Sequence, residues 1–277
     1  MILWQADFYR RPLQDATQQP LWELLLCTPD RTFEWVVWCP QSKANADWLT
    51  SQIQAAAGDR LPDRIQVFRP QSLGLLETAC QPLGITVEPT RQTSALKQWL
   101  EERVNIYPTL PEFTQQPYQP FQLDRPPPMP LPEQLWGDRW RFASLPAPEI
   151  ESGFRGRPIP ILEMPESRLP VNLGIASTMK VPGIVIDGGR QAMRLARWLA
   201  QVHPVSIHSI PGAPDGLILE AGLIDRWVVA TYDDSEVRTA AQLYEQRKQA
   251  AQGLHFLLVQ PDDSGVTYSG FWLLQDF

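Results

Sequence analysis

The spacing of apolar residues changes along the first hundred residues of the chain. Three early runs are apolar or alternate apolar with polar positions, which is typical of strands in an antiparallel meander. Later runs place apolar residues three or four positions apart, as an amphipathic helix does. The predicted strands span residues 2–14, 21–27, 33–40, 64–68 and 85–89, and the predicted helices span residues 42–56, 72–84 and 93–107.

This first region therefore has the predicted order β-β-β-α-β-α-β-α, which resembles the ribonuclease H-like arrangement. Strands joined through a helix are expected to be parallel, because a crossover returns the chain to the same edge of the sheet. Ser42 precedes the first helical run and is the expected N-cap of that helix.

The pattern of the last 140 residues predicts a second α/β region. Its predicted strands span residues 138–146, 158–165, 182–189, 205–210, 217–222, 226–232, 254–260 and 266–274, and its predicted helices span residues 190–202 and 233–253. The last two strands form a predicted hairpin, and 271–274 is apolar on both faces. We expect Trp272 to be buried in a central strand, and the alternative is an exposed Trp272 on which an RNA base stacks.

A Pro-rich segment separates the two regions. Nine of residues 108–137 are proline, a density that removes backbone donors and favours an extended chain. We interpret it as a semi-rigid linker, and docking of a PxxP-binding domain is the alternative. The sequence thus predicts two mixed-sheet α/β domains, residues 1–107 and 138–277, joined by a Pro-rich linker.

Composition and charge narrow the function classes. The chain of 277 residues is 43% hydrophobic, enough for packed cores, and has a net charge of -7, which argues against wrapping of duplex nucleic acid by a general positive field. Its three cysteines show no C-x-x-C spacing, so neither a disulfide framework nor a zinc site is predicted, and the reducing cytoplasm is the expected location. No signal peptide, transit peptide or transmembrane run is visible.

Local positive charge makes single-stranded RNA a candidate ligand. Arg190, Arg194 and Arg197 follow i, i+4, i+7 spacing on a predicted helix beside Trp198, and guanidinium groups with flat rings suit the phosphates and bases of a single strand. The alternative is an ordinary solvated helix face. The candidate RNA contacts are Arg155, Arg157, Lys180, Arg190, Arg194, Arg197 and Trp198. Asp187 lies just before this helix and is expected to cap it.

Catalytic patterns are weak by comparison. Asp7, Glu23 and Glu34 lie on the three predicted early strands and are candidates for a two-metal nuclease, but the next strand carries no acid. The three histidines and the absence of a G-x-S-x-G motif give no case for a hydrolase triad. We predict no catalytic residue, metal or cofactor, and keep a metal-dependent nuclease as the alternative.

Several motifs together carry a family resemblance. ADFYRRPLQD, LWELLLCTPD, FEWVVWCPQSKANADWL, a Pro-rich middle and a terminal GFWLL occur in this order. Over essentially the full length, the chain resembles the Tab/Atab family, RNA-binding proteins of cyanobacteria and chloroplasts required for translation of photosystem I messages. The resemblance implies binding to the 5' untranslated region of a photosystem mRNA, a role in photosystem biogenesis beside translation or assembly proteins, and no enzymatic activity. Without a transit peptide, a cyanobacterial member is expected.

Overall fold

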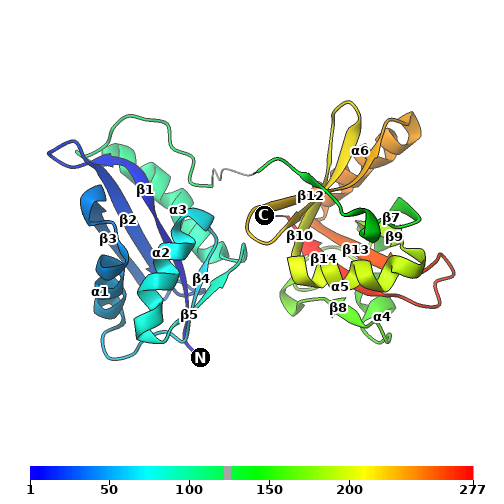
Figure 1. Ribbon diagram of the computed structural model, residues 1–277, viewed down its shortest axis with the longest axis horizontal. Coiled ribbons are helices and arrows are strands. Elements are labelled where there is room, and N and C mark those ends of the chain that lie inside the picture. Colours follow the sequence, from blue (N-terminus) through cyan, green and yellow to red (C-terminus); the bar gives the residue numbers. More distant parts are fainter. Residues whose placement is uncertain (122–125, 277) are drawn as a thin grey trace. The chain divides into compact units, whose positions relative to one another are not determined.

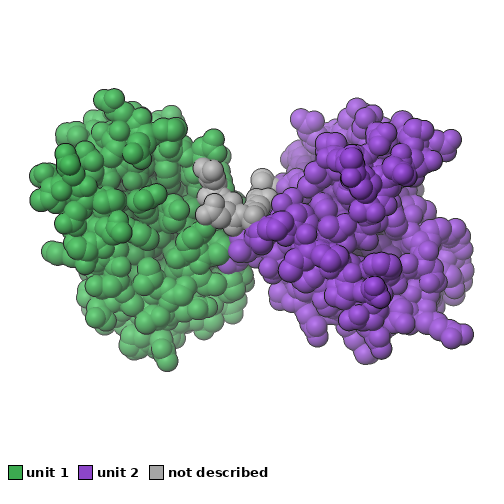
Figure 2. All heavy atoms as spheres, turned by 45° about the horizontal axis from the view of Figure 1, so that its top comes forward, with its two compact units in different colours: residues 1–124 green, residues 125–277 purple. Residues whose placement is uncertain are grey.

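The apolar side chains of the early strands need cover from helices, and the computed structural model shows that helices lie on both faces of their sheet. It describes residues 1–121 and 126–276, and the chain divides into two compact units, Met1–Asp124 and Arg125–Phe277 (Figure 2). The domain limits drawn from the sequence, at 107 and 138, stay predictions. Residues 122–125 of the Pro-rich segment and Phe277 of the terminal motif lie outside the described residues.

Unit 1 consists of one sheet with helices on both faces (Figure 1). The sheet order is β3-β2-β1-β4-β5; β2 is antiparallel to its neighbours, whereas β1, β4 and β5 are parallel. The elements are β1 (Leu3–Gln14), β2 (Pro20–Cys27), β3 (Glu34–Pro40), α1 (Ala46–Ala57), β4 (Arg64–Val67), α2 (Pro70–Cys80), β5 (Thr86–Pro89) and α3 (Ser94–Ile106). The predicted order of elements is confirmed.

Strand alternation divides the core of unit 1 in two. Leu24 and Leu26 of β2 pack with α1 and α2, whereas Leu25 and Cys27 pack with α3 on the opposite face. The predicted cap of the first helix is wrong by three residues. Asn45 adopts an extended conformation and its Oδ1 accepts a hydrogen bond from Trp48 N at 2.9 Å, while residues 41–43 form a separate 3-10 turn.

Unit 2 contains two sheets. The five-stranded sheet has the order β7-β9-β13-β14-β8 and the four-stranded sheet has the order β10-β11-β12-β6. The strands are β6 (Met129–Pro130), β7 (Arg139–Pro146), β8 (Ile161–Glu163), β9 (Lys180–Asp187), β10 (Pro204–Ile210), β11 (Asp215–Ala221), β12 (Asp225–Tyr232), β13 (Leu254–Gln260) and β14 (Gly270–Gln275), and the helices are α4 (Ala147–Phe154), α5 (Ala192–Val202) and α6 (Ser235–Ala250). One face of the larger sheet packs with α5, α6 and the smaller sheet, and its other face packs with α4.

The apolar segment near the end of the chain lies in the interior of the larger sheet. Strand β14 lies between β13 and β8, and Trp272 and Leu273 are fully buried on its opposite faces. The predicted burial of Trp272 is therefore confirmed, although the strand begins at Gly270 and not at residue 266. Within the described residues, no helix has the length and apolar character that a membrane crossing requires.

Candidate nucleic-acid interface

The candidate interface lies where several loops of unit 2 meet at one edge of the larger sheet. The parallel strands β9 and β13 both end there, and β14 and β8 both begin there. The loops that follow or precede these strands supply residues 157–160, 189–193 and 261–269. In open α/β sheets, the carboxyl ends of parallel strands are the usual place for ligands.

These loops enclose a cleft of about 460 Å³, which we name the Arg157 cleft. Its lining residues are Arg157, Pro158, Ile159, Pro160, Gly189, Arg190, Ala192, Met193, Pro261, Val266, Thr267, Tyr268 and Ser269. Arg157 Nη1 donates to Tyr268 Oη and to Gly265 O, each at 3.1 Å, and the guanidinium carbon lies 5.1 Å from the centroid of the Tyr268 ring. The cleft thus combines two arginines with an aromatic ring.

Arg190 reaches the cleft because of a backbone feature. It lies in the 3-10 turn Gly189–Gln191 (η6) and not in α5, which begins at Ala192, so the predicted single helix from residue 190 is wrong. Gly189 has φ +51°, and a Cβ there would lie 2.1 Å from Asp138 Oδ2, so this position requires glycine. The tight turn places Arg190 on the cleft wall at the start of the helix.

Arg194 and Arg197 continue the positive surface along α5. Together with Arg190 they form what we call the Arg stripe. All three are exposed, and none of their side chains makes a hydrogen bond or ion pair within residues 1–121 and 126–276. The opposite face of α5 packs into the core through Leu195 and Leu199. The stripe is therefore a set of cations that can bind phosphates without first breaking an internal ion pair.

The other predicted contacts are distributed differently. Trp198 is half-buried and packs edge-on against Trp227 of β12, with ring centroids 5.1 Å apart, so it joins α5 to the smaller sheet. Lys180 begins β9, at the end of the strand opposite the cleft. Arg155 follows α4 and forms ion pairs with Glu151 and Glu166. The structure thus brings Arg157 and Arg190 together, places Arg194 and Arg197 beyond them, and leaves Arg155 and Lys180 elsewhere.

Asp187 does not cap the helix, contrary to the prediction. Among the described residues, no side chain caps the start of α5. Asp187 instead accepts hydrogen bonds from Gln260 at 2.7 Å, Arg141 at 2.8 Å and Arg139 at 2.9 Å. Burial opposes its ionisation, but these three hydrogen bonds outweigh burial and hold the pKa of Asp187 below its ordinary value. Asp187 thereby fixes the end of β9, from which the Gly189 turn departs.

The candidate nuclease carboxylates of unit 1 are occupied by arginines. Asp7 accepts hydrogen bonds from Arg11 and Arg69, each at 2.7 Å, and Glu23 accepts from Arg11 at 2.8 Å and also from Arg103. Both carboxylates are fully buried. Burial would raise the pKa of each group, but the adjacent guanidinium charges outweigh burial and lower the pKa of both.

The arginines that pair with Asp7 and Glu23 have further partners, and the third candidate acid, Glu34, is not part of this cluster. Tyr118 Oη accepts a hydrogen bond from Arg11 at 2.7 Å, and Pro120 O accepts one from Arg69 at the same distance. Glu34 lies apart at the surface, paired with Arg31. In the described part of the chain, no group of three or more His, Cys, Asp or Glu residues is arranged to hold a metal ion.

Sequence patterns did not reveal Tyr268 as a member of the cleft. The alternation of residues 266–274 placed it inside a strand, whereas it lies in the loop before β14 and contacts Phe154 with ring centroids 5.7 Å apart. Arg157 and Tyr268 are 111 residues apart along the chain, and no local pattern indicates that they meet.

Comparison with known proteins adds the following findings. The family model described as RNA-binding protein Tab2/Atab2 N terminal matches residues 3–103, and the model of the Tab2/Atab2 C-terminal domain matches residues 118–275. Proteins named Protein TAB2 homolog, chloroplastic, from Zea mays and Arabidopsis thaliana, are each 31% identical to this chain over 99% of its length, covering 71% and 74% of those proteins. A solved HTLV-2 integrase catalytic core domain in complex with magnesium is 17% identical over 40% of this chain and 75% of that chain, with a TM-score of 0.26, a likeness that carries no argument.

Proposed function

The chain belongs to the Tab2/Atab2 family of RNA-binding proteins, and from this premise we propose that it binds single-stranded RNA without catalysis. Its proposed target is the 5' untranslated region of a photosystem mRNA, and its proposed role is in translation or biogenesis of photosystem subunits. Translation or assembly proteins are the proposed protein partners.

The Arg157 cleft with the adjacent Arg stripe is the observation that carries this proposal. Single-stranded RNA binds where cations meet the phosphates and aromatic rings meet the bases. Arg157 and Arg190 line one cleft with Tyr268, and Arg194 and Arg197 extend the charge along α5. Because the chain has a net charge of -7, its general field does not attract RNA, and this local concentration of arginines favours a few phosphate contacts at one site.

The buried carboxylates of unit 1 support a role without catalysis. A two-metal nuclease needs carboxylate oxygens that are free to bind the ions. The oxygens of Asp7 and Glu23 instead accept hydrogen bonds from guanidinium groups, which a metal ion would have to displace against their positive charge. This arrangement favours a structural role for both acids.

The proposed photosynthetic context is supported by the names of the relatives, and the proposed location is supported by the state of the cysteines. Both curated relatives are named as chloroplastic proteins, which fits a photosynthetic context. Cys27, Cys39 and Cys80 are buried and unpaired, as expected for a protein of the reducing cytoplasm, which we propose as the location.

Incubation of the pure protein with labelled RNA tests the proposed function. We expect single-stranded RNA to be retained intact with or without Mg²⁺ and Mn²⁺, and duplex RNA of the same sequence to bind more weakly. Equal affinity for both forms contradicts the single-strand preference, and metal-dependent shortening of the RNA contradicts the absence of catalysis. Crosslinking in cells followed by sequencing of the bound RNA then tests whether a photosystem message is the target.

A further inference from the structure

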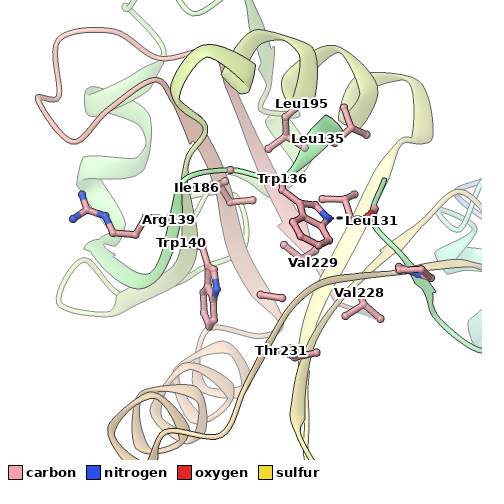
Figure 3. A pocket seen from close by; sticks show the side chains of 13 residues that line it. Leu131, Leu135, Trp136, Arg139, Trp140, Ile186, Leu195, Val228, Val229 and Thr231 are labelled. Carbon is pink, nitrogen blue, oxygen red and sulfur yellow. Dashed lines mark hydrogen bonds between the residues drawn. The ribbon is translucent and has the colours of Figure 1, made fainter. Parts of the chain in front are cut away.

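A second cavity in unit 2 contains two tryptophans. It has a volume of about 380 Å³ and lies between β12, the segment 130–140 and the start of α5 (Figure 3). We name it the tryptophan pocket. Its lining residues are Pro130, Leu131, Leu135, Trp136, Gly137, Arg139, Trp140, Ile186, Leu195, Val228, Val229, Ala230 and Thr231. None of the residues predicted from the sequence as RNA contacts lines it.

Trp136 is both exposed and held in place. Its side chain is large and apolar, yet the residue is 56% exposed. Its Nε1 donates a hydrogen bond to Leu131 O at 2.9 Å, so the indole has a defined orientation, and Figure 3 shows it beside Val228 and Val229. A Cβ on Gly137 would lie 2.6 Å from Ile186 Cγ2, so glycine is needed where the chain passes β9 between the two tryptophans. The result is a flat aromatic surface set in advance of binding.

The edge of β12 supplies polar groups to the same pocket. Strand β6 pairs only with Trp227 and Val228, and no strand of the described chain pairs with Val229–Thr231 on that side. Val229 is also the extra residue of a bulge against β11. Backbone N–H and C=O groups on an unpaired strand edge are free to form hydrogen bonds. An apolar cavity with a few such groups is typical of a site for a small planar ligand.

Charge at the pocket favours a neutral ligand. The one charged residue in the lining is Arg139, which pairs with Asp187 and Asp263. Figure 3 shows its guanidinium directed away from both indoles. Phosphates are therefore expected to bind elsewhere. Arg190, whose side chain makes no ion pair in the described part of the chain, lies on the turn that follows β9.

The tryptophan pocket and the Arg157 cleft share the turn after β9. Asp138 N donates to Asp187 O at 2.8 Å, and Asp138 lies against Gly189, so the segment that carries Trp136 and Trp140 contacts this turn directly. The same turn carries Arg190 into the Arg157 cleft. An RNA strand whose phosphate contacts Arg190 would thus lie next to both cavities.

From these observations we infer that the tryptophan pocket binds one nucleobase of the RNA strand, stacked on Trp136 with its edge hydrogen-bonded to the β12 backbone. This inference rests on the proposed function. An apolar side chain of a protein would also fill the volume, but the flat exposed indole, the open strand edge and the neighbouring Arg190 together favour a base.

RNA strands with single abasic positions test the inference. One single-stranded RNA is compared with versions in which one nucleotide in turn keeps its ribose and phosphate but lacks its base, so that charge is unchanged. With the wild-type protein, we expect one abasic position to reduce affinity about five- to a hundred-fold, the range for loss of one stacked base. With Trp136→Ala, the intact strand should bind as weakly as that abasic strand, and the abasic position should have no further effect.

Two further variants serve as controls. Trp136→Phe retains a ring and should restore much of the affinity, and Val171→Ala removes a 72% exposed apolar side chain of unit 2 and should change nothing. If wild-type protein binds RNA but Trp136→Ala binds it equally well, the inference is overturned while the proposed function stands. Failure of wild-type protein to bind any RNA overturns the proposed function itself.

Discussion

Replacing Asp7 by Asn should strongly destabilise unit 1. Asp7 is fully buried and accepts a 2.7 Å hydrogen bond from each of two guanidinium groups, those of Arg11 and Arg69. Asparagine has no charge and offers one acceptor oxygen, so one of the two guanidinium groups loses a hydrogen bond. The negative charge beside both arginines is also removed, although Arg11 keeps its ion pair with Glu23. Two hydrogen bonds to charged groups contribute about 1.5–3 kcal/mol each, and breaking a buried ion pair from one side costs about 3–5 kcal/mol. We expect a loss of about 3–5 kcal/mol in the free energy of unfolding.

Urea unfolding followed by tryptophan fluorescence measures this loss, and Glu34→Gln is the matched control. Glu34 was also a candidate metal ligand, but it lies at the surface and pairs with Arg31, so its replacement should have a small effect by comparison. The reasoning is refuted if the two variants unfold at the same urea concentration. It is also refuted if Mg²⁺ or Mn²⁺ raises the midpoint of the wild-type protein but not that of Asp7→Asn, because the acid would then be a metal ligand.

Three other predictions concern the RNA site, the core and the response to acid. Replacing the three arginines of the Arg stripe by Gln should keep α5 folded and weaken RNA binding. The slope of log affinity against log salt concentration should fall by about 0.7 for each phosphate that the protein no longer neutralises. The control Arg155→Gln removes an arginine already paired with two acids and should leave this slope unchanged; equal slopes for both variants would mean that the stripe only faces solvent. Trp272→Ala should lower the free energy of unfolding by about 3–5 kcal/mol and affect RNA binding only through unfolding, and a thermal midpoint unchanged from wild type would contradict its burial. The buried carboxylates Asp7 and Glu23 have folded-state pKa values below their unfolded values. Their contribution to stability is therefore present above about pH 4 and is lost as the pH falls through the folded-state pKa values. Between pH 7 and pH 3, the urea midpoint should fall less in Asp7→Asn than in the wild type.

Local patterns were sufficient to predict most of unit 1. The apolar run of β2 and the helical spacing of Leu49 and Ile53 are local patterns, and each gave an element of the right type in the right order. The helix start was harder, because Ser42 and Asn45 are both good capping residues and the outcome depended on backbone conformation. Helix α4 and the short strand β6 were missed, since neither has enough periodic residues to form a pattern.

The candidate site could be predicted only in part. The exposure of Arg194 and Arg197 follows from helical periodicity, so the sequence was enough to find them. The pairing of Arg157 with Tyr268 depends on loops brought together by the sheet, and the neutralisation of Arg155 by Glu151 and Glu166 depends partly on a tertiary contact. Trp136 lay within the segment interpreted as a linker, and the sequence predicted no contacts for side chains in that segment.

Mapping the RNA contacts by ultraviolet crosslinking and mass spectrometry of the crosslinked peptides tests the central claim most directly. The full chain is irradiated with a single-stranded RNA that it retains, and an excess of unlabelled strand distinguishes specific crosslinks from background. The account predicts crosslinks in residues 157–160, 189–197 and 265–269 of unit 2, at the Arg157 cleft and the Arg stripe. Crosslinks confined to unit 1 would contradict it.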